Sequence, residues 1–176
     1  MATDESMRLR PIREDDLPRL ARLEAEVEAT PWTIGNFKDA LSSGYPSAAA
    51  VDEADEPTAW AVFMQTLDEA ELLICGTAPE HQRRGLMTKL LASALLDMKR
   101  MGGRVMHLEV RASNEPAIAL YEKLGFRLTG RRPNYYYYSG RHEDAVLMQC
   151  AATDALALQW MKRGGGLFIF TPFAAC

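Results

Sequence analysis

Apolar residues recur three or four positions apart in several stretches of the chain, which is the spacing of one face of an α-helix. Asp15, Asp16 and Pro18 are typical of a helix start. The most regular stretch ends at Gly102-Gly103, and its apolar positions are Leu86, Leu90, Leu91, Ala94, Leu95 and Met98. This spacing predicts helices over about residues 16–28, 34–42, 84–101 and 117–124.

Other stretches alternate between apolar and polar positions, or form short apolar runs between turn residues, as strands do. After residue 104, Met106 and Leu108 face one way while His107 and Glu109 face the other. Strands are predicted over residues 7–10, 48–51, 59–66, 71–77, 105–110, 126–129, 135–138 and 145–149, with a turn at 139–141. The mixed order contains a strand–helix–strand–helix unit, which indicates an α/β (α+β) domain with three layers.

The two ends of the chain do not fit this pattern. Residues 1–6 are expected to form a loose leader. Residues 151–161 have the composition of a short helix, and Gly164-Gly165-Gly166 separates them from an apolar stretch over residues 167–173. That stretch fits a docking strand, an interface or a disordered end, and all three interpretations stay open.

The chain has 176 residues, of which 48% are hydrophobic and 25% charged, as expected for one globular domain. Its net charge of −4 argues against a general nucleic-acid binder but leaves room for a local basic pocket. Three cysteines and three histidines are scattered without paired spacing. We therefore expect no disulfide scaffold and no metal site, and a reducing compartment.

The beginning of the chain is acidic and lacks the apolar core of a secretory signal. No stretch reaches the roughly 20 apolar residues of a membrane span. These features predict a cytoplasmic protein without membrane contact. We expect a monomer or a weak dimer.

One loop has the composition of an anion site. Arg83, Arg84 and Gly85 lie just before the most regular predicted helix. A helix start presents free N–H groups and the positive end of the helix dipole, and a glycine lets a ligand approach the main chain. These features suit a pyrophosphate, although an ordinary solvated turn has the same composition.

Neighbouring motifs resemble the GNAT superfamily of N-acetyltransferases. Residues 82–88 resemble its motif A, and a second signature, motif B, is carried by Asn114, Ala117, Leu120, Tyr121, Gly125 and Phe126. Pro31-Trp32-Thr33, Phe37 and the segments 131–136 and 140–145 resemble the RimI branch, which acetylates the N-terminal alanine of a small-subunit ribosomal protein. The resemblance covers about residues 7–149 and leaves 150–176 as a C-terminal extension of unknown role.

The resemblance implies a GNAT-type α/β/α domain whose mixed, mostly antiparallel sheet is splayed at the acetyl-CoA site. It implies a protein N-terminus as acceptor, direct attack in a ternary complex, and neither a metal nor direct nucleic-acid contact. Glu109 matches the general base and Tyr121 the general acid. The residues that match acetyl-CoA-binding positions are Cys75, Gly76, Thr77, Arg83, Arg84, Gly85, Leu86, Met87, Thr88 and Asn114.

The chemistry independently favours these residue types. An N-terminal ammonium has a pKa of roughly 7.7–8.0 and must lose a proton before it attacks a thioester. Glu109 can accept that proton, and we expect burial to raise its pKa. A phenol such as Tyr121 can protonate the leaving thiolate, and the N–H of Thr77 is a candidate oxyanion donor. No acyl-enzyme is needed, so Cys75 is not required as a nucleophile.

Two positions depart from the family pattern. Met87 stands where Gly or Ala is usual, so its side chain must point away from the phosphates. The segment Cys75-Gly76-Thr77 replaces an aliphatic run, and Gly76 weakens the strand or eases its splay. Either change puts cofactor affinity in doubt. Three other functions therefore stay open: acetylation of a small amine, acetylation of a broader set of protein N-termini, and a non-catalytic acyl-CoA sensor.

Several residues also have simpler interpretations. Glu109 can pair with Arg111 or a lysine, Tyr121 can be a core residue, and His107 can be a hydrogen-bonded histidine rather than a second base. Trp32 and Phe37 can line a peptide pocket or pack the second helix. Two of the four tyrosines at 135–138 are expected to pack and two to face solvent or substrate. Glu143 and Asp144 can attract an ammonium or form a solvated acidic turn.

Overall fold

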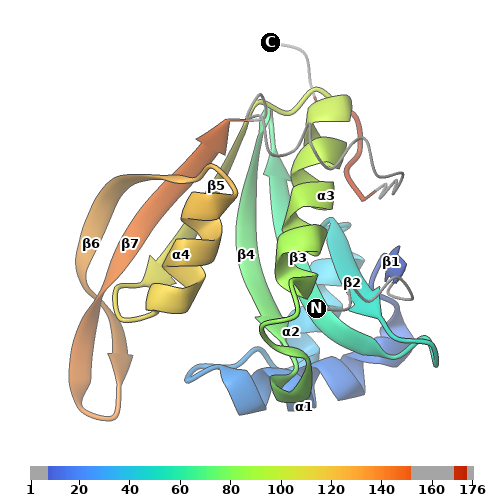
Figure 1. Ribbon diagram of the computed structural model, residues 1–176, viewed down its shortest axis with the longest axis horizontal. Helices are drawn as coiled ribbons and strands as arrows, with labels where there is room; N and C mark the ends of the chain where they lie inside the picture. Colours follow the sequence, from blue (N-terminus) through green and yellow to red (C-terminus); the bar gives the residue numbers. More distant parts are fainter. Residues whose placement is uncertain (1–7, 152–168, 174–176) are drawn as a thin grey trace.

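The computed structural model describes residues 8–151 and 169–173 (Figure 1). The helices are α1 (Leu17–Val27), α2 (Ile34–Ser42), α3 (Leu86–Arg100) and α4 (Glu115–Lys123), with short 3-10 turns η1 (Glu14–Asp16) and η2 (Pro79–His81). The strands are β1 (Arg8–Arg10), β2 (Ser47–Val51), β3 (Pro57–Thr66), β4 (Glu69–Thr77), β5 (Val105–Arg111), β6 (Arg127–Tyr138) and β7 (Arg141–Ala151). The order of elements follows the prediction except in the closing hairpin, where one strand replaces two.

The strands form one seven-stranded sheet in the order β1-β2-β3-β4-β5-β7-β6. All neighbours are antiparallel except β4 and β5, which are parallel and are connected through α3. These two strands lie side by side where they begin and separate toward their ends (Figure 1). The predicted mixed, mostly antiparallel and splayed sheet is confirmed.

Helices cover both sides of the sheet. One hydrophobic cluster joins α3 and α4 to the sheet and contains Phe63, Leu90, Leu91, Met98, Met106 and Phe126. A second cluster joins α1 and α2 to the sheet and contains Leu20, Phe37, Val51, Trp60 and Val62. The molecule therefore has the three layers that the pattern predicted (Figure 1).

The largest helix begins later than its apolar pattern indicates. The prediction started it at Arg84, whereas α3 begins at Leu86. Gly85 has a φ of +78°, which is left-handed and cannot continue a right-handed helix. Arg83 and Arg84 therefore lie in the loop before the helix.

The closing hairpin also differs from the prediction. The two short strands expected at 126–129 and 135–138 are one strand, β6, interrupted by irregular pairing on both sides of residues 130–132. Asn134 has a φ of +53° there, and its N–H donates to Asp144 Oδ1 at 3.0 Å. The predicted turn before β7 is confirmed, with positive φ at Ser139 and Gly140, as two-residue hairpins require.

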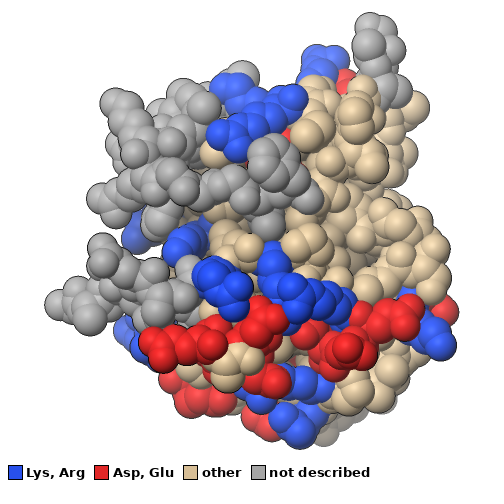
Figure 2. Space-filling model, turned by 90° about the vertical axis from the view of Figure 1, so that its right-hand side faces the viewer, with Lys and Arg blue, Asp and Glu red and all other residues tan. Residues whose placement is uncertain are grey.

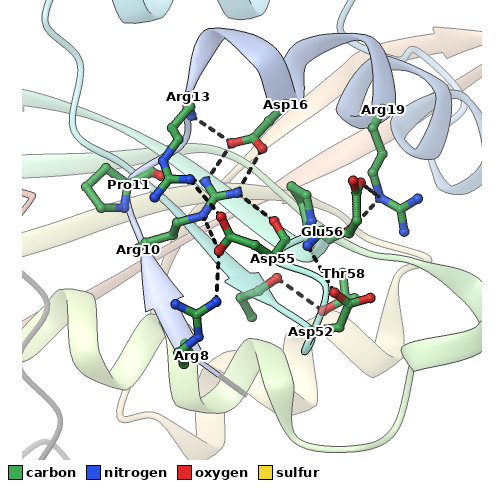
Figure 3. A network of polar contacts seen from close by, with 12 residues as sticks. Arg8, Arg10, Pro11, Arg13, Asp16, Arg19, Asp52, Asp55, Glu56 and Thr58 are labelled. Carbon is green, nitrogen blue, oxygen red and sulfur yellow. Dashed lines mark hydrogen bonds and ion pairs between the residues drawn. The ribbon is translucent and has the colours of Figure 1, made fainter. Parts of the chain in front are cut away.

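A buried charge network fixes the beginning of the sheet (Figure 3). The Arg10 guanidinium donates to both oxygens of Asp16, at 2.7 and 2.9 Å. Asp16 also accepts from the N–H of Arg13 at 2.7 Å, and Arg10 Nε donates to Asp55 at 3.1 Å. Arg10 therefore joins β1 to Asp16 of η1 and to Asp55 of the β2–β3 turn, and the Asp16 side chain makes no capping bond to α1.

Part of the C-terminal extension packs on the domain. Asp97 on α3 is fully buried, and its Oδ2 accepts from the N–H groups of Ile169 and Phe170 at 2.6 and 2.9 Å. Phe170 and Phe173 join the core under α3. Residues 169–173 are thus a docked segment, and β7 continues to Ala151, past the predicted boundary at 149. The predicted leader at 1–6 and nearly all of the predicted helix at 151–161 lie outside the described residues.

The side of the molecule at the β1 edge carries acidic and basic atoms close together, so this side is not uniformly basic (Figure 2). Within residues 8–151 and 169–173, no helix has the length and apolar composition needed to cross a membrane. The same residues contain no cluster of three histidine, cysteine or carboxylate side chains that could bind a metal.

Candidate active site

The site is built around the point where β4 leaves β5. Pairing of the two strands stops at Leu72 and Leu108. The register of β4 on β3 shifts at the same place, with Leu72 and Ile74 opposite adjacent residues, so Leu73 is an extra residue. Such a bulge bends a strand. Residues 74–77 consequently pair only with β3, and no strand among the described residues pairs with their other edge.

The predicted pyrophosphate residues gather at one end of this segment. Gly85 is the N-cap residue of α3 and has no side chain to cap the helix, and a Cβ at Gly85 would meet no atom within 4 Å. The N–H groups of Leu86 to Thr88 lie in the first turn of α3 and have no partner within the helix. They follow a glycine whose Cβ position is open. Met87 is half-buried and packs against the core under α3.

Tyr121 on α4 reaches the splayed strand from the α3 and α4 side of the sheet. Its hydroxyl lies 3.2 Å from Cys75 Sγ on β4, and only 6% of the residue is exposed. Burial, together with the nearby thiol, raises the pKa of Tyr121 well above the usual value of a phenol. Burial also raises the pKa of the Cys75 thiol to about 11. Both groups are therefore protonated at neutral pH.

Glu109 on β5 lies across the opening from β4. Its side chain is 20% exposed, and its Oε1 lies 3.1 Å from Arg132 Nε on β6. The simpler interpretation named Arg111 or a lysine as its partner, but the observed partner is Arg132. Glu109 also raises the pKa of Tyr136, after the larger effect of burial, so this phenol lies within electrostatic reach of the carboxylate.

Arg111 on β5 connects β6, β7 and the segment that follows α1. Its guanidinium lies 4.2 Å from the centre of the Tyr136 ring, 3.6 Å from Glu143 and 3.4 Å from the Thr30 hydroxyl. Glu143 also accepts from the N–H of Ser113 at 2.7 Å. Hydrogen bonds from Ser113, first from its side chain and then from its N–H, lower the pKa of Glu143. Glu143 and Asp144 are therefore bonded to the main chain and to arginines rather than forming a purely solvated turn.

Sequence reasoning did not single out Glu28, which follows the last turn of α1. Burial raises its pKa, and its charge raises the pKa values of both Tyr121 and Tyr136. Among the described residues, none donates a hydrogen bond to its carboxylate. A glutamate at a helix C-terminus interacts unfavourably with the helix dipole. This placement is the feature of the sequence that could have singled out Glu28.

Other candidates have structural partners. His107 Nε2 lies 2.9 Å from Glu69 Oε2, as expected for a hydrogen-bonded histidine. Asn114 caps α4 by accepting from the N–H of Ala117. Trp32 and Phe37 pack edge to face, with ring centres 5.3 Å apart. These contacts favour packing for Trp32 and Phe37.

The tyrosines of β6 differ from the expected two-and-two division. Tyr136 alone is half-buried, whereas Tyr135, Tyr137 and Tyr138 are 49%, 62% and 55% exposed. The reason is that β6 is the edge strand, and its outer end has little covering it. Tyr136 is the member of this group that faces Arg111 and the site.

Comparison with known proteins shows the family of this chain. Residues 8–126 match the acetyltransferase (GNAT) family. The ribosomal protein bS18-alanine N-acetyltransferase of Salmonella typhimurium is 38% identical over 133 residues, which are 76% of this chain and 89% of that protein. The crystal structure of the ribosomal-protein-S18-alanine N-acetyltransferase from Escherichia coli has 33% sequence identity and a TM-score of 0.78, and covers 85% of this chain and 96% of that one.

A more distant structure shares the fold alone. Arabidopsis thaliana NAA60 in complex with acetyl-CoA is 23% identical, with a TM-score of 0.73 over 82% of this chain and 98% of that chain. The matched residues 8–126 include the splayed strand, the start of α3, Glu109 and Tyr121. The chain therefore belongs to the acetyltransferase (GNAT) family.

Proposed function

We propose that this protein transfers an acetyl group from acetyl-CoA to the N-terminal amine of a protein, with the alanine N-terminus of a small-subunit ribosomal protein as the acceptor. The observation that carries the proposal is the enclosed, protonated Tyr121 phenol at the free edge of β4, with a carboxylate, Glu109, on the neighbouring strand β5. Relatives more than 35% identical have this activity in their names. We further propose that it acts in the cytoplasm, as a monomer or weak dimer.

The residues present fit acetyl-CoA. The main chain of Cys75 to Thr77 has one edge without a strand partner, as an extended pantetheine arm requires. The start of α3, from its N-cap Gly85 to Thr88, suits a pyrophosphate, and Arg83 and Arg84 add positive charge nearby. Asn114 is the remaining candidate contact, at the start of α4. When bound, acetyl-CoA supplies the thioester.

Two different residues carry the two proton transfers of the proposed reaction. Glu109 accepts a proton from the acceptor ammonium, directly or through one water. Glu28 adds a second negative charge on the α1 side and helps to bind the ammonium before that transfer. Tyr121 donates its proton to the leaving sulfur, because burial keeps the phenol neutral. Cys75 stays a thiol and takes no acetyl group.

Thiol release from acetyl-CoA tests this function with acceptors in parallel. The acceptors are a peptide beginning Ala-Arg-Tyr, the same peptide already acetylated at its N-terminus, and a panel of small amines. Release with the free peptide alone supports the proposal. Release with small amines alone would overturn the proposed protein acceptor but not the fold or the acid–base chemistry. Measurable acetyl-CoA binding without any thiol release would favour a non-catalytic sensor.

A further inference from the structure

The splayed segment of β4 is held by strand pairing at one edge only. Residues 74–77 pair with β3, while pairing with β5 ends at Leu72. Under the proposed function, the free edge receives acetyl-CoA. Because no neighbouring strand fixes that edge, the position of the segment depends on the side chains that pack on its two faces.

Trp60 packs directly on this segment. It is the cross-strand partner of Gly76 and is fully buried. A Cβ built on Gly76 would overlap Cζ2 of the indole and lie 2.7 Å from Cε2 and 2.9 Å from Cη2. The indole therefore occupies the space that any side chain at position 76 would need. This fit gives a physical reason for the glycine in place of the usual aliphatic residue.

Glu24 holds the indole in that position. Trp60 Nε1 donates to Glu24 Oε2 at 2.8 Å, and Glu24, on α1, has no exposed surface. Its other oxygen, Oε1, has no hydrogen-bond partner among the described residues. A buried carboxylate with an unsatisfied oxygen costs stability, so its contribution is better explained by the geometry that it imposes on Trp60 than by stabilisation.

We propose that Trp60 and Glu24 are positioning residues for acetyl-CoA, with the indole acting as a spacer that sets the main chain of Gly76 and Thr77 at the free edge of β4. This inference rests on the proposed function and extends it to two residues that act through the strand rather than by touching the cofactor. The chain of contacts runs from Glu24 on α1, through Trp60 on β3, to Gly76 on β4.

A double-mutant cycle tests the spacer. Calorimetry with acetyl-CoA gives the Kd of the wild type, Trp60→Phe, Gly76→Ala and the double variant. We expect each single change to weaken binding about tenfold, which is the effect of roughly 1.4 kcal/mol. In the double variant the Kd should rise much less than the product of the two single increases, because phenylalanine lacks the ring atoms that the new Cβ would overlap.

Changes at Glu24 test the same contacts without altering either strand. Glu24→Gln keeps an acceptor for Trp60 Nε1, so its Kd should stay within about threefold of the wild type, whereas Glu24→Ala should weaken binding about tenfold. In all variants the KM for acetyl-CoA should change more than kcat. This split distinguishes positioning of the cofactor from a loss of folded protein.

Gly103→Ala is the matched control for a packing collision. A Cβ there would lie 2.5 Å from Met98 and 2.9 Å from the Phe173 ring, at the other end of α3 from Gly85. We expect it to lower the Tm and to leave the Kd for acetyl-CoA within about twofold, as for distant independent sites.

The outcomes separate this inference from the proposed function. A wild-type protein that does not bind acetyl-CoA overturns both. Wild-type binding with an unchanged Kd in Trp60→Phe and Gly76→Ala overturns the positioning role alone. If Gly76→Ala does not fold, Glu24→Ala decides, because an unchanged Kd in that variant also overturns the proposal.

Discussion

The Sγ atom of Cys75 lies 3.2 Å from the hydroxyl oxygen of Tyr121, and both groups are protonated at neutral pH. The contact joins the splayed strand to α4, on the side of the sheet opposite Trp60. It places a neutral phenol beside the free edge of β4, where the proposed reaction needs a proton donor. The roles of the two residues in this pair can be separated by mutation.

Tyr121→Phe should slow turnover by roughly 10²-fold, in the range for loss of a general acid. The phenyl ring keeps the packing against Phe126, whose ring centre is 5.7 Å away, so the fold and the KM for acetyl-CoA should change little. Steady-state kinetics with the Ala-Arg-Tyr peptide measures this. An unchanged kcat would remove Tyr121 from the chemistry.

Cys75→Ala should keep kcat within a few-fold of the wild type, because a thiol with a pKa of about 11 is a poor nucleophile at neutral pH. Intact-protein mass spectrometry during turnover should show no acetyl group on the enzyme. Loss of activity in this variant, together with acetylated Cys75 in the wild type, would replace direct attack with a covalent mechanism.

Glu109→Gln should lower the rate most at low pH, where the acceptor amine is mostly an ammonium and needs a base. Acetyl-CoA affinity should be nearly unchanged. Glu69→Gln is the matched control, since this carboxylate lies on β4 but is exposed and paired with His107. A large loss of acetyl-CoA binding in Glu109→Gln would make Glu109 structural rather than catalytic.

Glu28→Gln should raise the KM for the peptide by about fivefold to tenfold and leave the KM for acetyl-CoA unchanged, because it removes one charge from the side that receives the ammonium. Glu26→Gln, an exposed glutamate on the same helix, is the control. Equal effects of the two substitutions would indicate general electrostatic attraction rather than a site at Glu28.

Stability should depend on pH through Glu24, because burial raises its pKa from 4.5 to about 7. A raised pKa in the folded state favours folding below pH 4.5, and this contribution is lost as the pH rises through 7. The wild type should therefore lose roughly 2 kcal/mol relative to Glu24→Gln between pH 4.5 and 7. Urea unfolding at several pH values measures the difference, and a constant difference would contradict the assignment.

Local signals in the sequence predicted most of the elements. The second helix, over Ile34–Ser42, was predicted with its observed bounds, and in the structure Thr33 and Asn36 form a capping box at its start. The start of α3 was missed by two residues, because the apolar pattern does not show the left-handed backbone of Gly85. Irregular pairing within β6 was also missed, since it depends on Asp144 of the partner strand.

The motifs brought Cys75, Glu109 and Tyr121 to attention, but not their partners. Arg132 was not expected beside Glu109, because the register shift in β6 decides which arginine reaches β5. The fit of Trp60 over Gly76 is likewise a cross-strand relationship that no local pattern carries. Residues that are distant in sequence therefore supply the features of the site that local patterns could not predict.

The central claim is that the acetyl group goes to the α-amine of a protein N-terminus. The most direct test incubates the protein and acetyl-CoA with an Ala-Arg-Tyr peptide that also contains a lysine, and locates the added acetyl group by fragmentation in tandem mass spectrometry. We predict a single acetyl group on the N-terminal alanine. An acetyl group on the lysine, or an unmodified peptide beside acetylated small amines, would contradict the claim.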